Sequence, residues 1–144
     1  MTEQAQHAQA LRLTVRRRGD IAVLDLAGDI DRGGGDALQR GYQQAVATGA
    51  ARLLLNFAEV GYINSTGIAL LVGLLARARK ERRPVSACAV SEHYRRIFGI
   101  TRLSDFIGLY PDEDSAIAGD GAAGGAATRM DTGARASDTQ GGTP

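Results

Sequence analysis

Apolar and polar residues alternate near the start of the chain in the pattern of a half-buried strand. Leu11, Leu13 and Val15 are separated by polar residues, so their side chains would share one face of a sheet. After a short turn, residues 21–28 (IAVLDLAG) predict the antiparallel hairpin partner of this strand. Residues 51–57 (ARLLLNF) are almost continuously apolar, which is typical of a central strand covered on both faces.

Helical spacing of apolar residues or helix-end signals mark three further segments. Residues 36–48 have apolar positions three and four apart and end before Gly49, a common helix stop. A longer helix is predicted over 66–80, with cations in the last turn, where the helix dipole favours them. A short helix is predicted over 92–98, with Ser91 as its N-cap.

The remaining segments complete the predicted fold class. Residues 84–90 and 106–110 predict two more strands, and residues 112–118 predict a fragment of helix. The order β-β-α-β-α-β-α-β predicts an α/β fold, in which a mixed central sheet begins with an antiparallel hairpin and has helices packed against it.

The folded part is expected to end before the chain does. Residues 119–144 contain no aromatic residue and no Leu, Ile or Val, so we expect a disordered Gly/Ala-rich tail. Residues 1–10 are polar and unpatterned, and we expect a flexible N-terminus there. The chain of 144 residues is then one domain over 11–118.

Composition mainly excludes classes of function. A formal net charge of +1 argues against nucleic-acid binding, which needs many cations to neutralise phosphates. The one cysteine, Cys88, cannot form an internal disulfide, which indicates an intracellular protein. The start has no apolar signal region, and the longest apolar run, residues 68–75, is too short to span a bilayer. We therefore expect a cytoplasmic protein that is not in a membrane.

The most informative segment is 60–68 (VGYINSTGI), which we interpret as a loop that leaves a central strand and opens a helix. Asn64 or Ser65 is a natural N-cap, because either side-chain oxygen can accept from the exposed N–H groups of the first turn. A plain cap is the simplest interpretation. Ile68 stands where a capping box would place Glu or Gln, so that reciprocal motif is missing and a function beyond capping stays open.

The helix after this loop is apolar around much of its circumference. Leu71, Leu74 and Leu75 form one stripe at helical spacing, but Ile68 and Val72 extend the apolar surface around the helix. Burial under a neighbouring helix and a partner surface near the N-terminal turn are both compatible with this pattern. Two glycines in the helix, Gly67 and Gly73, each cost about 1 kcal/mol of helix propensity, which favours close approach of another backbone.

Three stretches together resemble a known family. They are LAGDIDRGGGDAL, LLLNFAEVGYINSTGIALLVGLLARARK and ACAVSEHYRRIFGITRLSDFIGLY. They are similar to the STAS domain of the anti-sigma factor antagonist family, and the likeness covers Leu11 to about Ala118. The most specific element is the apolar strand followed by Ser65-Thr66-Gly67 and the helix. The Gly-acid-aliphatic-Asp element at residues 28–31 supports it.

The resemblance implies a STAS fold and a phosphorylation-controlled binding module that is not an enzyme and has no cofactor. The unphosphorylated protein would bind an anti-sigma factor with an ATP-dependent serine kinase fold and free the sigma factor for transcription, in a stress response. The kinase would phosphorylate Ser65, with Thr66 as second choice, and a metal-dependent serine phosphatase would reverse the reaction. The family usually has Asp before this serine, whereas this chain has Asn64.

The resemblance and the pattern together define a predicted docking surface. Its residues are Asp29, Asp31, Asn64, Ser65, Thr66, Gly67, Ile68 and Val72. A phosphate on Ser65 would add about −1.5 to −2 charges at a helix start, where the dipole favours an anion. We therefore expect the fold to survive phosphorylation while the docking surface changes charge.

Other chemistries lack the residues they need. Asp29, Asp31 and Asp36 surround a triple glycine, but the twelfth position of a calcium loop counted from Asp29 is Arg40, so we predict no metal site. The triple glycine is more simply a flexible start to the helix at Asp36. Cys88 lies in an apolar strand and is predicted to be a buried structural thiol, not a nucleophile working with Glu92 and His93.

Two alternatives to the switch stay open. The first is a STAS scaffold or accessory subunit, part of a stress-signalling assembly or of a transporter, in which Ser65 is only a helix residue and copies of the chain form homo-oligomers. The second is a small enzyme or nucleotide-binding protein, for which the sequence shows no suitable set of residues.

Overall fold

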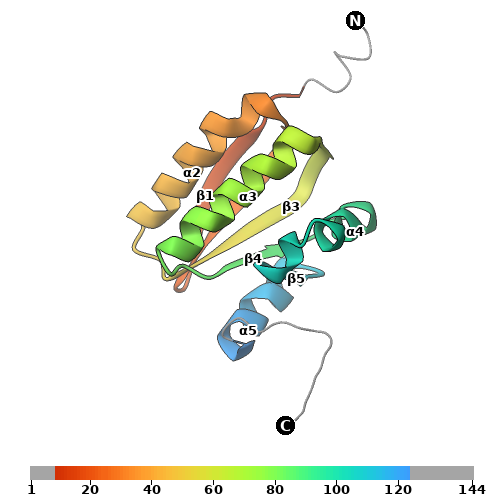
Figure 1. The fold of residues 1–144 in the computed structure, drawn as a ribbon. Helices are drawn as coiled ribbons and strands as arrows, with labels where there is room; N and C mark the ends of the chain where they lie inside the picture. The colour runs from red at the N-terminus through yellow and green to blue at the C-terminus, as the bar shows by residue number, and fades with distance from the viewer. Residues whose placement is uncertain (1–8, 124–144) are drawn as a thin grey trace, which may run out of the picture.

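The computed structural model describes residues 9–123, and within them one five-stranded sheet has the order β1-β2-β3-β4-β5 (Figure 1). The strands are β1 (Arg12–Arg18), β2 (Ile21–Ile30), β3 (Arg52–Ile63), β4 (Val85–Cys88) and β5 (Gly108–Tyr110). The helices are α2 (Gly35–Ala47), α3 (Ser65–Lys80), α4 (Glu92–Ile100) and α5 (Glu113–Ala123), with short 3₁₀ turns η1 (Arg32–Gly34) and η2 (Leu103–Asp105).

The sheet is mixed, as the sequence predicts. β1 and β2 form an antiparallel hairpin in register from Arg12 opposite Ala27 to Arg18 opposite Ile21. The other neighbours, β2–β3, β3–β4 and β4–β5, are parallel. The predicted fold class is therefore confirmed. Because β2 and β3 are parallel neighbours, their carboxyl ends meet at one edge of the sheet.

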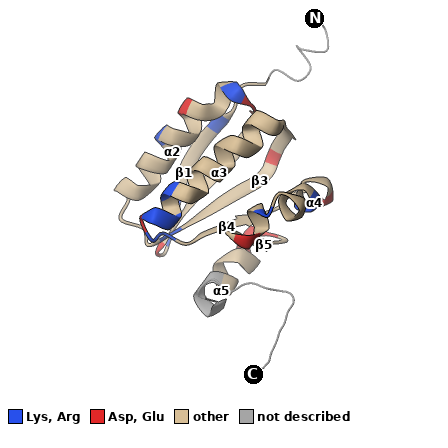
Figure 2. Ribbon diagram, in the orientation of Figure 1, with Lys and Arg blue, Asp and Glu red and all other residues tan. Residues whose placement is uncertain are grey.

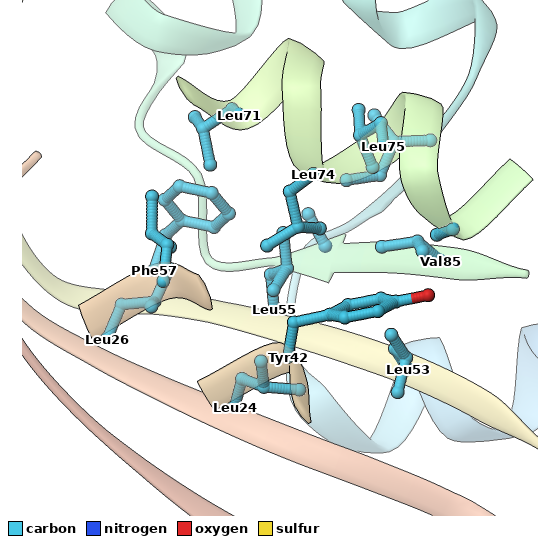
Figure 3. Close-up of a cluster of buried hydrophobic side chains, with 14 of the residues drawn as sticks. Leu24, Leu26, Tyr42, Leu53, Leu55, Phe57, Leu71, Leu74, Leu75 and Val85 are labelled. Carbon is cyan, nitrogen blue, oxygen red and sulfur yellow. The ribbon is translucent and has the colours of Figure 1, made fainter. Parts of the chain in front are cut away.

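One face of the sheet carries α2 and α3, which lie side by side and run roughly along the direction of β1 and β3 (Figure 1). Leu53, Leu55 and Phe57 alternate along β3 and are at most 4% exposed. Figure 3 shows them packed with side chains from β2, β4 and both helices. The labelled members of this cluster are Leu24, Leu26, Tyr42, Leu53, Leu55, Phe57, Leu71, Leu74, Leu75 and Val85. α4 adds Phe98, which is fully buried and meets Phe57 edge to face at a centroid distance of 5.9 Å.

The opposite face has a smaller apolar cluster beneath α5. Ile21, Val23, Leu54 and Cys88 lie there with Ala116 of α5, each at most 1% exposed. Leu54 stands between two residues that face α2 and α3, so β3 is buried on both faces. This confirms the interpretation of the run at 51–57 as a central strand.

Ion pairs hold α5 to the N-terminal hairpin. Arg16 donates to Glu113 at 2.8 Å and also pairs with Asp25 on β2, while Arg18 donates to Glu113 at 2.7 Å. Hydrogen bonds from Arg16 and then Arg18 lower the pKa of Glu113, and the bond from Arg16 lowers the pKa of Asp25. Both carboxylates therefore stabilise the fold in their charged form.

We expect the α5 anchor to be lost in acid. A carboxyl whose pKa is lower in the folded than in the unfolded chain contributes stability above its unfolded pKa and loses it as the pH falls through the folded value. The free energy of unfolding should therefore drop below about pH 4, and Glu113→Gln should make this drop smaller. Urea titrations at several pH values measure it. Glu59→Gln, at an exposed position of β3, is the control; equal acid sensitivity of both variants would contradict the expectation.

Several element boundaries differ from the sequence prediction; β4 and β5 are shorter than the predicted strands over 84–90 and 106–110, and α4 runs two residues past 98. β3 continues to Ile63, so residues 60–63 are strand where we predicted a loop; they pair with β2 through two register shifts near Gly28. α5 is longer than predicted and runs to Ala123, beyond the expected domain end at 118. The helix after the triple glycine begins at Gly35, because 32–34 form a 3₁₀ turn instead of a flexible start.

The predicted ends of the chain lie almost wholly outside the described residues. Gln9 and Ala10, which we assigned to a flexible N-terminus, lie within them, and the carbonyl oxygen of Gln9 accepts a hydrogen bond from the Asp29 N–H at 2.9 Å. Residues 1–8 and 124–144 are outside the described part of the chain.

Candidate functional site

Asn64 is the whole connection between β3 and α3. Its N–H donates to the Ile30 carbonyl oxygen at 3.2 Å, and its own carbonyl oxygen accepts the Ile68 N–H at 2.9 Å, the first helical bond. Its side-chain Oδ1 accepts the Gly67 N–H at 2.8 Å. Of the two caps that the sequence allows, Asn64 is therefore the N-cap, which leaves the hydroxyl of Ser65 unused for capping.

Ser65 is the first residue of α3 and is exposed, as is Thr66. The first N–H groups of a helix have no partner within the helix, and the Asn64 side chain accepts that of Gly67. The N–H groups of Ser65 and Thr66 remain at the exposed start of the helix, with the positive end of its dipole. An anion added at the exposed Ser65 would meet favourable electrostatics there.

Gly67 allows the start of α3 to lie directly against the end of β2. A Cβ built on Gly67 would come within 1.9 Å of the Ile30 carbonyl oxygen, far inside van der Waals contact. The prediction that glycine permits close backbone approach in this helix is thus confirmed at Gly67. It is wrong at Gly73, where a Cβ would meet nothing within 4 Å.

Asp29 and Asp31 lie near Ser65 because β2 and β3 end together. Asp29 pairs in register with Tyr62, three residues before Ser65. Its side chain is buried, however, with the residue only 5% exposed, and its Oδ2 accepts the Gln9 N–H at 3.2 Å. Asp29 thus binds the backbone of Gln9 in this structure, and its contact with a partner stays a prediction.

Asp31 is half-buried and shapes the turn after β2. Its Oδ1 accepts the Gly33 N–H at 3.0 Å and so caps the 3₁₀ turn η1. The backbone of this turn contacts α3. Asp31 therefore lies near the start of α3, and one of its carboxylate oxygens is already hydrogen-bonded to Gly33.

The two apolar side chains of the predicted docking surface, Ile68 and Val72, differ in solvent exposure. Ile68 is half-buried against the main core, whereas Val72 is 46% exposed. Both Ser65 and Val72 are exposed on α3, with exposed Ala69 between them at helical spacing. Ser65, Thr66 and Val72 thus supply accessible groups, while Asn64, Gly67 and Ile68 position them.

Two tyrosines at this site were not predicted from the sequence. Tyr94 of α4 accepts the Ile63 N–H on its hydroxyl oxygen at 2.9 Å and so fixes the residue before Asn64. Tyr62 is 42% exposed next to the buried Ile63. The alternation Tyr62-Ile63 would have indicated an outward aromatic, had residues 60–63 been interpreted as strand.

The alternative chemistries gain no support from the structure. No cluster of three or more His, Cys, Asp or Glu suitable for a metal occurs within residues 9–123. Cys88 is buried, and burial together with nearby carboxylates raises the pKa of its thiol to about 11. Its sulfur lies 3.7 Å from Asn56 Oδ1 beneath α5, whereas His93 is exposed and meets the Tyr94 ring edge to face. The prediction of a buried structural thiol is confirmed.

Solved structures of other proteins share this fold. An anti-sigma factor antagonist from Mycobacterium paratuberculosis is 24% identical, with a TM-score of 0.65 over 76% of this chain and 92% of that one. The Bacillus protein SpoIIAA in its phosphorylated form is 20% identical, with a TM-score of 0.57 over 76% and 97%. A sulfate transporter family protein from Wolinella succinogenes is 17% identical, with a TM-score of 0.62 over 72% and 86%. These likenesses define the fold class, the STAS fold.

The family follows from the sequence. Residues 13–110 match the family described as Mlab, STAS domain. That range covers the five strands except Arg12, the first residue of β1, together with the helices α2 to α4, so the chain belongs to the STAS domain family. Within residues 9–123, no helix is both long enough and apolar enough to cross a membrane.

Proposed function

We propose that this protein is a cytoplasmic anti-sigma factor antagonist controlled by phosphorylation of Ser65. Unphosphorylated, it binds an anti-sigma factor of the serine kinase fold and thereby frees the sigma factor. The kinase transfers the γ-phosphoryl group of ATP to the Ser65 hydroxyl oxygen, releasing ADP and a proton. A metal-dependent phosphatase then transfers the group to water and restores the binding form.

The single observation that supports this proposal is that Ser65 is an exposed residue at the start of a helix capped by Asn64. Because Asn64 caps α3, phosphorylation of Ser65 breaks no structural hydrogen bond of the cap. The helix start accepts the added charge, so the body of the domain keeps its fold. A partner that contacts Ser65, Thr66 and Val72 in the unmodified form then meets a dianion at that surface.

The test combines a kinase assay with binding measurements. Purified protein incubated with its kinase and ATP should gain the mass of one phosphate, and Ser65→Ala should prevent this while Thr66→Ala does not. Ser65→Ala should bind the partner normally, whereas Ser65→Asp should bind at least about tenfold more weakly, a loss of about 1.4 kcal/mol. Titration calorimetry measures both affinities.

A matched variant separates the local charge from the net charge. Gln43→Asp adds the same charge on the exposed side of α2 and should leave binding unchanged. Ser65→Asp bound as tightly as the unmodified protein would refute the switch. Phosphate found on Thr66 and not on Ser65 would mean that Thr66 is the phosphorylated residue.

A scaffold or accessory subunit is the second candidate, favoured by the likeness to the Wolinella protein of the sulfate transporter family. In this case Ser65 is never modified, and the exposed part of α3 packs against a transporter or another copy of the chain. Stable assemblies of the purified protein in light scattering, together with no phosphate gained from the kinase, would favour this function over the switch.

A further inference from the structure

A groove of about 580 Å³ lies between the C-terminal half of α3 and the segment from Thr101 to Phe106. Leu75 and Leu103 line it as buried residues. Its sides include Val72 and Phe106, which are 46% and 52% exposed. Large apolar side chains that stay half in water on a small domain indicate a surface that another molecule covers.

Cations surround this groove. Arg79, Lys80 and Arg102 line it, and no acidic residue does. The guanidinium of Arg79 lies over the Phe106 ring, 5.0 Å from its centroid. Figure 2 shows the positive charge gathered at the C-terminal end of α3.

Two of the three cations that line the groove, Arg79 and Lys80, form no ion pair within residues 9–123. Glu81, the acidic residue that follows α3, accepts from the Tyr42 hydroxyl at 2.6 Å and pairs with Arg77 and Arg83. Arg102 pairs with Asp105 at 2.7 Å. Neither Arg79 nor Lys80 has a carboxylate within ion-pair distance in the described part of the chain. The groove therefore combines an apolar lining with an unbalanced positive rim.

We propose that this groove is a docking site for an amphipathic segment of a partner protein, with apolar side chains for the groove and carboxylates for Arg79 and Lys80. A helix or extended segment fits better than a small ligand, because enclosed ligand sites bury most of their ligand, whereas Val72 and Phe106 leave this groove open. The charge complement selects an acidic segment over a neutral one.

The end of this chain is a poor occupant. Residues 124–144 contain two Asp and two Arg, and Met130 is their one large apolar side chain. They offer neither the excess of carboxylates nor the apolar stripe that the groove would bind. The C-terminal residues are thus not the occupant that we propose.

The groove is continuous with the surface around Ser65 but does not depend on its modification. Val72 belongs to both surfaces, because Ser65, Ala69 and Val72 are spaced four and three residues apart and so lie on the same face of α3. A partner seated at the start of α3 could extend into the groove, and a separate partner could use the groove alone. Binding at the groove should therefore persist in Ser65→Ala.

The probe is a synthetic peptide of about 18 residues, long enough to form five helical turns. It carries Leu at helical spacing on one face and Glu elsewhere, and a counterpart replaces every Glu with Gln. Fluorescence anisotropy with the full chain should show saturable binding of the Glu peptide that weakens with salt. The Gln peptide should bind at least about fivefold more weakly, because it lacks the carboxylates.

Charge reversal locates the site. Arg79→Glu combined with Lys80→Glu should weaken binding of the Glu peptide at least about tenfold. Arg12→Glu combined with Arg40→Glu makes the same change of net charge at exposed positions away from the groove, and should change affinity less than about twofold. Thermal unfolding of both double variants checks that they remain folded.

Four outcomes would overturn the proposal. They are no saturable binding of the Glu peptide, equal affinity for the Gln peptide, equal weakening by the two double variants, and release of the peptide by phosphatidylglycerol vesicles that bind the protein more tightly. The last would assign the groove to an anionic membrane surface. None bears on Ser65, so this proposal and the phosphorylation switch can fail separately.

Discussion

Gly67→Ala is expected to lower the free energy of unfolding by about 2 to 3 kcal/mol, because it forces atoms into an occupied space. The new Cβ would lie 1.9 Å from the Ile30 carbonyl oxygen and 2.7 Å from its carbon. This carbonyl cannot move freely, since it also accepts the Asn64 N–H at the start of α3. Urea denaturation of the variant and the parent protein measures the loss.

Gly73→Ala is the matched control, in the same helix and with the same chemical change. A Cβ at Gly73 would meet nothing within 4 Å, and the residue is exposed. Alanine there should raise the free energy of unfolding by up to about 1 kcal/mol through its better helix propensity. If both variants changed stability in the same direction, the close approach of α3 to β2 would not be what Gly67 provides.

Phe98→Ala should cost about 3 to 5 kcal/mol, a large share of the stability of a domain of this size. Phe98 is fully buried and attaches α4 to the core through its edge-to-face contact with Phe57. Removing the ring leaves a cavity that the strands of the sheet cannot collapse to fill. Thermal and urea unfolding, followed by circular dichroism, measure the effect.

Phe106→Ala removes the same ring from a position that is 52% exposed. It should cost less than about 1.5 kcal/mol, because much of the ring is already in water and no comparable cavity forms. Its main loss is the contact with Arg79. Similar costs for the two variants would mean that α4 and η2 are packed differently from this structure.

Much of the fold could be predicted because its apolar pattern is regular. The alternation in β1 and the continuous apolar run in β3 each have one simple burial solution, on one face of a sheet and on both faces. The extension of β3 to Ile63 could not be predicted in the same way. Residues 58–62 are exposed or half-buried, and their strand conformation depends on pairing with β2 across two register shifts.

The candidate site was only partly predictable for a related reason. A cap at Asn64 or Ser65 could be predicted from local chemistry, since either side chain can accept from the first turn, but the choice of Asn64 comes from the structure. The burial of Asp29 depends on Gln9, and the position of Ile63 depends on Tyr94, 31 residues away. The groove between α3 and η2 likewise arises from segments far apart in sequence, which no local pattern reports.

The backbone at Ser65 is held on both sides, because only Asn64 separates β3 from α3 and Gly67 lies directly against Ile30. Under the proposed switch, the kinase therefore has to recognise Ser65 on the folded surface and not in an extended segment. Unfolded copies of the chain would then not be phosphorylated.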